Sequence, residues 1–550
     1  MKGLKGETLS TLSTFSSLSS LMKTYSLLFF ALLCTGFVSG QNRQNPKVSE
    51  PFYYQSFDNE KIDMEKMRKE AAFYMRALFQ PVYSEGISGQ ALDLTENIPF
   101  RIPYMLVPEV CPSYDENSSF AIQVWVQTLK EAQQGTPIMT NKQADDKDSI
   151  GWCIGTQENG AWFWNISDGK TTFSYEPTAK RQAINDGEWH QIVVSVDRNK
   201  QEMRMYLDGK NVAIYRLETR TAQGVLNLGS VVTSLRTVIG GSDEYAEPEH
   251  NASRGEWMAF NGKVDEVKIW AHPITAAEVS ANYTQHKPSS ADVVMKTPDR
   301  LKVQVWNIWH GGHRNGLHVG VARTAQILKD ENADFIGLIE TYGSGAILAD
   351  SLGYYFYLLS TNLSIMSRYP IIETIKIYES FFSGGALLDL GNNQKLAFFD
   401  TWLWYADNER RHREIKSILS EMKPFIDRAD ETPVIMVGDF NTHSHLDVPE
   451  AEASKLPVTM EVLNAGFGDS YRIVHPDPIV SPGFTWTPLY NEQAIRENRG
   501  TLDNLYRRID YIFFKGKKLD LSYSAKLDHH PVFWPSDHGS VVSWFYFDQK

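Results

Sequence analysis

Seven polar side chains in the C-terminal half follow, or lie within, apolar runs of the kind that form buried strands. They are Asn307 after VQVW, Glu340 after FIGLI, Asp439 and Asn441 after VIMV, Asp510 within RIDYIF, and Asp537 and His538 just before SVVSWFYF. Each one alone also fits a cap, a turn or a solvated strand end. Gathered at one edge of a sheet, they would form an oxygen-rich pocket with one imidazole. That donor set favours Mg²⁺ or Mn²⁺ over zinc.

The elements that would carry these side chains alternate between strands and helices. Strands are predicted at 301–309, 334–340, 433–440, 508–514 and 540–547, and helices at 318–332 and 409–422. The second helix places Ile415, Ile418, Leu419 and Met422 on one face. Alternation of this kind predicts an α/β layered domain.

The N-terminal half has a different texture, with short alternating strands and frequent turns between residues 86 and 270. The pair Asp208-Gly209, between MRMYL and KNVAIY, is a strong hairpin signal. Many short strands with regular turns predict an all-β sandwich. The Trp residues of this half favour a role in the core over sugar stacking, because aromatic side chains dominate buried area.

Several strings of this half resemble the concanavalin/laminin-G-like lectin sandwich. They include FAIQVWVQ, GEWHQIVVSVD and GKVDEVKIWAHPITAAEV, and the last is the most specific. The resemblance implies a carbohydrate- or surface-binding module, or a spacer. The acidic loop Ala144 to Ser149 is a candidate Ca²⁺ site because it is rich in oxygen ligands, with a solvated loop as the alternative.

The C-terminal motifs WNIW, GLIE, LSIMSRYPI, GDFN, TWTP, RIDYIF and SDH, in this order, resemble the endonuclease/exonuclease/phosphatase superfamily. That group includes DNase I-like nucleases, neutral sphingomyelinases and inositol-polyphosphate phosphatases. The resemblance covers residues 301–547 and implies a DNase I-like four-layered α/β sandwich. The pair GDFN and SDH carries most of its weight.

The resemblance assigns metal binding to one group of residues and substrate handling to another. It makes Glu340 the principal metal ligand, with Asn307 beside it, and Asp537 completes the metal shell. Asp439 and Asn441 would position the attacking water and the phosphate. The implied cofactor is Mg²⁺, with Mn²⁺ as the alternative, because a cation is needed to neutralise the phosphoester and its leaving group.

The imidazole chemistry departs from the family pattern at one point. His538 would act as general base or phosphate stabiliser, held by Asp510. Many members carry a further His in a THL-like string, where this sequence has Trp402. The two His of WHGGH, His310 and His313, are candidate substrate-binding residues, because the paired glycines let the backbone approach a phosphate.

Length and charge bound the organisation of the chain. A chain of 550 residues exceeds a single core, so two large domains are expected, at 50–285 and 300–550, with a linker at 286–299. The formal net charge of -13 argues against a protein that coats polyanions. It leaves room for a metal-assisted enzyme, since a bound cation inverts the local charge.

The N-terminus predicts export. Residues 22–40 contain a basic residue, an apolar run from Leu27 to Leu33 and the small residues Ser39 and Gly40. This is a signal peptide pattern, with a lipid anchor on Cys34 as the weaker alternative. The apolar run is too short to span a membrane. After cleavage Cys111 and Cys153 remain, either as a disulfide or as two free thiols.

Together these features predict a secreted Mg²⁺-dependent phosphoesterase that acts on a phosphodiester or phosphomonoester. Its substrate would be a small molecule, a lipid head group or a nucleic acid, and nuclease and sphingomyelinase-like activities are the variants within this hypothesis. The alternative is a non-catalytic glycan-binding or adhesion protein with a degenerate enzyme domain. Trp402 favours that alternative, and the retained carboxylates and His538 favour the enzyme.

Overall fold

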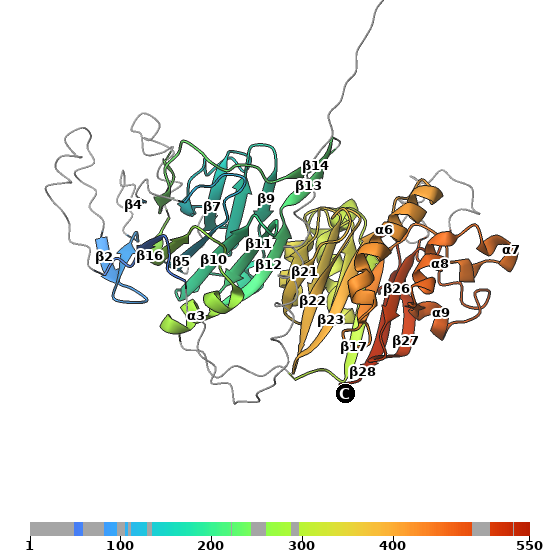
Figure 1. The fold of residues 1–550 in the computed structure, drawn as a ribbon. Coiled ribbons are helices and arrows are strands. Elements are labelled where there is room, and N and C mark those ends of the chain that lie inside the picture. Colours follow the sequence, from blue (N-terminus) through green and yellow to red (C-terminus); the bar gives the residue numbers. More distant parts are fainter. Residues whose placement is uncertain are drawn as a thin grey trace, which may run out of the picture. The chain divides into compact units, whose positions relative to one another are not determined.

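The computed structural model describes residues 49–58, 82–95, 105–107, 112–128, 135–221, 223–243, 260–287, 296–486, 506–531 and 533–549 (Figure 1). The predicted signal peptide, Cys111 and most of the expected linker lie outside these ranges. Within the described ranges, no helix has the length and apolar character needed to cross a membrane.

The N-terminal half forms the expected β-sandwich. One sheet runs in the order β2 (Val82–Glu85), β3 (Gln90–Asp93), β16 (Gly262–Trp270), β5 (Phe120–Thr128), β10 (Trp189–Asp197), β11 (Glu202–Leu207) and β12 (Lys210–Arg216), and β1 (Tyr53–Gln55) also pairs with β16. The other runs β4 (Met105–Leu106), β15 (Val238–Ile239), β6 (Pro137–Thr140), β7 (Gly151–Thr156), β8 (Trp162–Ser167) and β9 (Thr172–Tyr175). A hairpin of β13 (Glu218–Thr221) and β14 (Gly224–Asn227), and the helices α2 (Ala179–Gln182) and α3 (Ala276–His286), complete this half.

The local sequence explains one hairpin turn of the sandwich and the composition of its core. Asp208 and Gly209 adopt φ of 50° and 75°, which closes the two-residue turn between β11 and β12 that the sequence predicted. The prediction that Trp side chains form the core is confirmed for the described ones. Five have no exposed surface, and they are Trp125, Trp152, Trp162, Trp164 and Trp270.

The loop predicted as a candidate Ca²⁺ site uses its carboxylates within the turn. Asp146 accepts a hydrogen bond from the backbone N–H of Asp148 at 2.9 Å. The carboxylate of Asp148 accepts from the Thr172 hydroxyl at 2.7 Å. Calcium binding by this loop therefore stays a prediction.

The C-terminal half contains two packed sheets. The first runs β19 (Tyr355–Leu358), β20 (Leu363–Ser367), β18 (Phe335–Ile339), β17 (Arg300–Asn307), β28 (Ser540–Phe547) and β27 (Leu519–Leu527). The second runs β21 (Ile371–Ile375), β22 (Ser383–Gly391), β23 (Gln394–Trp402), β24 (Val434–Asp439), β26 (Asp510–Lys515) and β25 (Gly468–Asp469). Apolar side chains of both sheets form one buried cluster, which includes Val305, Phe398 and Ile512.

A glycine in β18 allows the two sheets to approach each other closely near the strand ends that carry Glu340 and Asp439. A Cβ atom on Gly337, in the middle of β18, would lie 2.4 Å from the Cγ2 atom of Val437 on β24. Any larger residue would push the sheets apart there. The Gly in FIGLIE therefore fixes the distance between the two strands that end at Glu340 and Asp439.

Helices cover the outer faces of both sheets. On one side lie α4 (Val319–Glu331) and α5 (Gly345–Leu352), with Ile327 and Leu328 packed in one cluster with Trp306. On the other lie α6 (Asn408–Ile426) and α8 (Pro457–Asn464), where Ile415 and Met422 are buried. Smaller segments are η5 (His310–Asn315), η6 (His445–Asp447), α7 (Glu450–Ala453) and α9 (Ser470–Val474). This confirms the four-layered α/β sandwich.

Candidate active site

Six of the seven polar residues predicted from strand ends line one open pocket of ≈ 470 Å³ in the C-terminal domain, and the seventh, Asp510, lies behind its wall in contact with His538. Strands β17, β18, β23 and β24 end at the wall of this pocket. The segment that leads into β28, with Asp537 and His538, also lines it. The described residues that line it are Asn307, Trp309, His310, Arg314, Glu340, Trp402, Tyr405, Asp439, Asn441, Trp486, Arg507, Ile509, Asp537 and His538. Seven of these were candidate site residues from the sequence.

Asn307 connects the ends of the two sheets. Its side-chain amide donates to Glu340 Oε1 at 3.2 Å and to Asp439 Oδ2 at 3.2 Å. Its oxygen accepts from the backbone N–H of Trp309 at 3.1 Å, which fixes the orientation of the amide. One neutral side chain thus holds two carboxylates from different sheets at the same pocket.

Glu340 is held in a strained backbone conformation directly after β18. Its φ is 58°, in the left-handed region that non-glycine residues seldom adopt. The Asn362 side chain accepts from its N–H at 3.1 Å, and Glu340 Oε2 accepts from the His310 N–H at 2.9 Å. Strain that neighbouring hydrogen bonds maintain is a common property of functional positions.

The GDFN turn presents Asp439 and Asn441 to the pocket. A Cβ atom on Gly438 would lie 1.9 Å from the Thr401 carbonyl oxygen, so β23 and β24 can approach only with glycine there. Asn441 has a φ of 52°, and its N–H donates to Asp439 Oδ1 at 3.0 Å. The Asn441 amide also donates to the Leu403 carbonyl at 3.0 Å. The turn therefore fixes both side chains.

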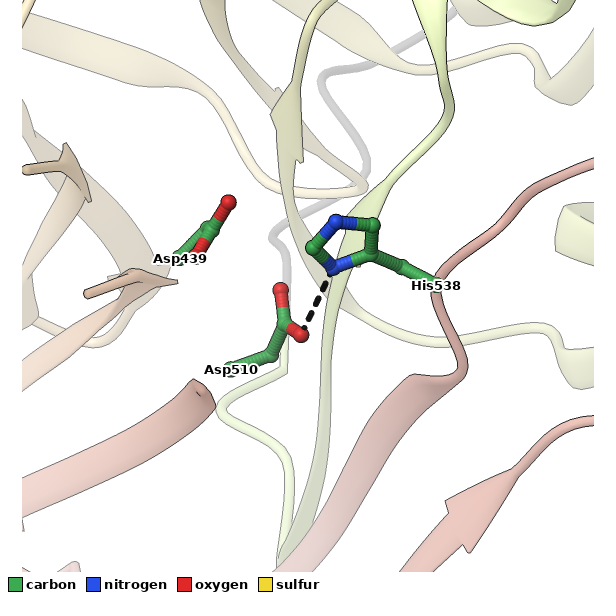
Figure 2. Close-up of side chains that lie close together, drawn as sticks. All are labelled: Asp439, Asp510 and His538. Carbon is green, nitrogen blue, oxygen red and sulfur yellow. Dashed lines mark hydrogen bonds and ion pairs between the residues drawn. The ribbon is translucent and has the colours of Figure 1, made fainter. Parts of the chain in front are cut away.

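Figure 2 shows His538 and Asp510 as a hydrogen-bonded pair, with Asp439 nearby. His538 Nδ1 lies 2.9 Å from Asp510 Oδ2, and both side chains are buried. Asp510 faces Asp439 as a cross-strand neighbour of β24 and β26. Since Nδ1 contacts Asp510, the Nε2 atom of His538 is the one that remains for a substrate.

Burial and mutual repulsion perturb the ionisation of this group. Burial, and then the charge of Asp510, raise the pKa of Asp439 to about 7. Burial also raises the pKa of Asp537 to about 6, with a contribution from the charge of Glu340. Burial alone would lower the pKa of His538, but Asp510 and the other carboxylates raise it to about 10. The imidazole is therefore protonated at neutral pH and offsets only part of the negative charge.

The donor set fits a divalent cation. Asp510 Oδ1 and Asp537 Oδ1 are buried and have no hydrogen-bond partner among the residues that the structure describes, which is unfavourable for a carboxylate oxygen. In the part of the chain that the structure describes, the group whose ligand atoms lie closest together is Asp439, Asp510 and His538, within 4.8 Å of one another. That group differs from the ligand set that the family resemblance gave. His538 Nδ1 contacts only Oδ2 of Asp510, and both oxygens of Glu340 accept hydrogen bonds from the protein. Oδ1 of Asp510 and Oδ1 of Asp537 are therefore the oxygens that the described residues leave for a cation.

The two histidines of WHGGH have different surroundings. His310 lines the pocket and stacks on Tyr342, with ring centroids 5.3 Å apart. His313 is not among the lining residues, so the structure brings only one of this pair to the site. The intervening Gly311 and Gly312 have φ of 69° and 76°, as the close backbone turn requires.

Trp402 ends β23 and lies in register with Asp439 on the neighbouring strand. Its ring stacks on Phe382, with centroids 5.7 Å apart, and meets Phe381 and Trp404 edge-on. It forms an aromatic wall of the pocket at the position where family members often carry His. An indole cannot exchange protons near neutral pH, so this wall contributes shape and not acid–base chemistry.

Sequence reasoning missed several residues of the pocket wall, namely Trp309, Arg314, Tyr405, Arg507 and Ile509. Arg507 and Ile509 flank the RIDYIF motif, and Trp486 belongs to the TWTP string that was noted without a role. Proximity to these motifs was the available signal. Arg314 directly follows the WHGGH string, and Tyr405 lies three positions after Trp402.

Comparisons with known proteins agree with this architecture. Residues 305–538 match the Endonuclease/Exonuclease/phosphatase family, and residues 103–280 match the Concanavalin A-like lectin/glucanases superfamily. An uncharacterized protein of Caenorhabditis elegans is 24% identical over 295 residues, which are 46% of this chain and 93% of that protein. A non-toxic nonhemagglutinin of Paraclostridium bifermentans is 27% identical over 125 residues, which are 23% of this chain and 10% of that protein.

Two solved structures are also similar to part of this chain. Truncated TDP2 of Caenorhabditis elegans is 19% identical, with a TM-score of 0.35, and the match covers 45% of this chain and 98% of that one. An endonuclease/exonuclease/phosphatase family protein of Bacteroides thetaiotaomicron is 16% identical, with a TM-score of 0.34, and the match covers 46% of this chain and all of that one. The chain thus joins a concanavalin A-like domain at residues 103–280 to a domain of the endonuclease/exonuclease/phosphatase family at residues 305–538.

Proposed function

We propose that this chain is an exported, divalent-metal-dependent phosphoesterase whose β-sandwich binds a carbohydrate or another surface. The observation that carries the catalytic part is the pocket itself. Three carboxylates and the imidazole of His538 line an open cavity of ≈ 470 Å³, and buried oxygens of Asp537 and of the neighbouring Asp510 have no partner among the described residues. A phosphate anion would be repelled from such a site without a cation, so the substrate and the metal are expected to bind together.

Glu340 and Asp537 would hold the metal, with Asn307 fixing the orientation of Glu340. Hard oxygen donors favour Mg²⁺ or Mn²⁺. When bound, the metal would supply positive charge to the phosphate oxygens and the leaving group. Asp537 is assigned to the metal because its Oδ1 atom has no hydrogen-bond partner among the described residues, and Glu340 because it lines the same pocket.

The remaining side chains have roles that follow from their contacts. Asp439, held at one oxygen by Asn307 and at the other by the Asn441 N–H, would position the attacking water. Asn441 lines the same pocket and would contact the phosphate. His538, kept in orientation by Asp510, would donate a hydrogen bond from Nε2 to a phosphate oxygen.

The test is hydrolysis of bis(p-nitrophenyl) phosphate by the purified chain with Mg²⁺, with Mn²⁺ and with EDTA. We expect metal-dependent activity that falls by about 10²–10⁴-fold in His538→Ala. His529→Ala is a matched control, because this imidazole is exposed and contacts only the adjacent Asp528. Activity that EDTA and His538→Ala both leave unchanged would refute the proposal.

The non-catalytic alternative rests on Trp402 in place of a proton-exchanging His. It predicts no hydrolysis by the wild-type chain with any metal, together with glycan binding by the β-sandwich. A screen of nucleic acids, phospholipids and phosphosugars with the wild-type chain would separate the two and would identify the substrate class. Binding of the chain to an array of glycans tests the role of the sandwich.

Export is proposed on the pattern of residues 22–40. Sequencing the N-terminus of the protein made by its own host tests this. A mature chain that begins at Gln41 outside the cytoplasm supports the proposal, and an intact Met22 in the cytoplasm contradicts it.

A further inference from the structure

Two adjacent arginines just before β26 have opposite electrostatic surroundings. The Arg508 guanidinium is buried and forms ion pairs with Asp447 and Asp469, each at 2.8 Å. The Arg507 side chain points instead to the pocket, where it is half-buried. Consecutive residues of an extended chain face opposite sides, which explains why one arginine serves the core and its neighbour the pocket.

Arg507 has no anionic partner among the residues that the structure describes. Its recorded side-chain contact is with the ring of Trp486, whose centroid lies 5.6 Å from the guanidinium carbon. Burial lowers the pKa of Arg507, and no carboxylate offsets that effect. A half-buried guanidinium without an anion is unusual, because Arg at such positions is normally paired.

Other basic groups near Arg507 make the missing anion more conspicuous. Burial and then the charge of Arg507 lower the pKa of His443. The Arg411 guanidinium donates to the carbonyl oxygens of Trp404 and Tyr405, at 2.9 and 2.7 Å, and Arg411 is not among the described residues that line the pocket. Within the described part of the chain, Arg507 therefore lines the pocket without an anionic partner.

The backbone holds Arg507 beside the reacting centre. The Trp486 N–H donates to the Arg507 carbonyl at 2.8 Å, and the Arg507 N–H donates to the Trp486 carbonyl at 3.0 Å. Trp486 also forms a bridge with His538 on its other side. One residue thus separates Arg507 from the imidazole that is proposed to contact the phosphate.

We propose that Arg507 binds the substrate through a non-bridging phosphate oxygen, as an anion-binding residue of the pocket. This inference rests on the proposed function for its substrate. The planar fork of a guanidinium matches two phosphate oxygens, so Arg507 would both attract and orient the phosphoryl group. Arg507 would supply positive charge to the pocket, which the indole of Trp402 cannot do. It would not act as a proton donor.

The experiment is calorimetric titration of the full chain with inorganic phosphate in Mg²⁺, beside hydrolysis of bis(p-nitrophenyl) phosphate. We expect Arg507→Met to weaken phosphate binding about tenfold or more, because a charge-assisted hydrogen bond is lost. Arg507→Lys should recover only part of the affinity, since a point charge lacks the fork. Arg413→Met is the matched control, because Arg413 is exposed on α6 and pairs only loosely with Glu409.

The two proposals fail in different ways. If no phosphoester is hydrolysed but Arg507→Met still weakens phosphate binding, the catalytic function is wrong and the anion site stands. If the chain is active and Arg507→Met equals wild type in phosphate affinity and in kcat/KM, the anion site is wrong and the function stands. A wild-type chain that binds no phosphate in Mg²⁺ also overturns the role of Arg507.

Discussion

Two groups of buried carboxylates in the C-terminal domain have opposite charge balance. Asp447 and Asp469 are matched by Arg472 and Arg508, at distances of 2.7 to 2.8 Å. Three carboxylates of the pocket, on Asp439, Asp510 and Asp537, face a single imidazole, and Glu340 adds a fourth negative charge.

The difference teaches how this fold separates structure from chemistry. Buried charges that serve stability are paired, since an unpaired charge in the interior is strongly unfavourable. In the pocket the negative charge is left in excess, and two carboxylate oxygens have no partner. That excess of negative charge is tolerable only if the pocket binds a cation or if its carboxylates take up protons. Cation binding is the alternative that would give the pocket a role in catalysis.

A substitution in the pocket group, which consists of Glu340, Asp439, Asp510, Asp537 and His538, should have the largest effect, and that effect should be on activity. In Asp510→Asn, His538 loses the carboxylate that holds its proton and orientation, so we expect hydrolysis to fall by about 10²–10⁴-fold. Stability should change little, because the substitution also removes repulsion with Asp439. Rates and urea denaturation of the same preparation measure both. A large loss of stability with normal specific activity would reverse the comparison.

A substitution in the charge-paired group of Asp447, Asp469, Arg472 and Arg508 should lower stability instead of activity. Arg508→Met leaves Asp469 without its ion pair and removes one of the two partners of Asp447. We expect a loss of about 3–5 kcal/mol in the free energy of unfolding, the usual result of removing one member of a buried pair. Urea denaturation measures it, with the exposed Arg413→Met as control. Wild-type stability in Arg508→Met would show that this cluster does not stabilise the fold.

Metal binding should neutralise the excess negative charge of the pocket carboxylates and thereby stabilise the folded chain. A cation that binds only the folded state at 100 times its Kd adds about 2.7 kcal/mol of stability. We therefore expect Mg²⁺ to raise the Tm of the wild type, and to raise that of Asp537→Asn much less. Asp520→Asn, at an exposed position on β27, should respond as the wild type does. An equal rise in Asp537→Asn and in wild type would exclude Asp537 from the metal site.

The sequence predicted the elements of this domain well because each one is marked locally. The apolar runs before Asn307, Glu340 and Asp439 became β17, β18 and β24, and the amphipathic pattern at 409–422 became part of α6. The six predicted metal and catalytic residues that line the pocket were found because they directly follow or precede such runs.

Long-range contacts were beyond the reach of the sequence. The string RRID shows two arginines, but not which one faces the pocket. That depends on Asp447 and Asp469, which lie 61 and 39 positions away from Arg508. The two His of WHGGH were treated as equivalent, and among the described residues the structure places only His310 at the pocket.

The smallest expected effect comes from adding a second imidazole to the acid-rich pocket. Trp402→His places a group that can donate a proton at the end of β23, in register with Asp439. We expect a gain of about tenfold with alkyl phosphodiesters, whose poor leaving groups need a proton, and no gain with p-nitrophenyl esters. Loss of stacking on Phe382 should lower the Tm slightly.

Comparison of kcat for the two substrate classes measures this gain independently of folding. Trp404→His is the matched control, since Trp404 contacts Trp402 but does not line the pocket. Equal gains with both substrate classes would mean that the new side chain acts by shape and not by proton transfer. The aromatic wall would then set which phosphoester enters, while Arg507 and the metal ligands carry the charge on the phosphate.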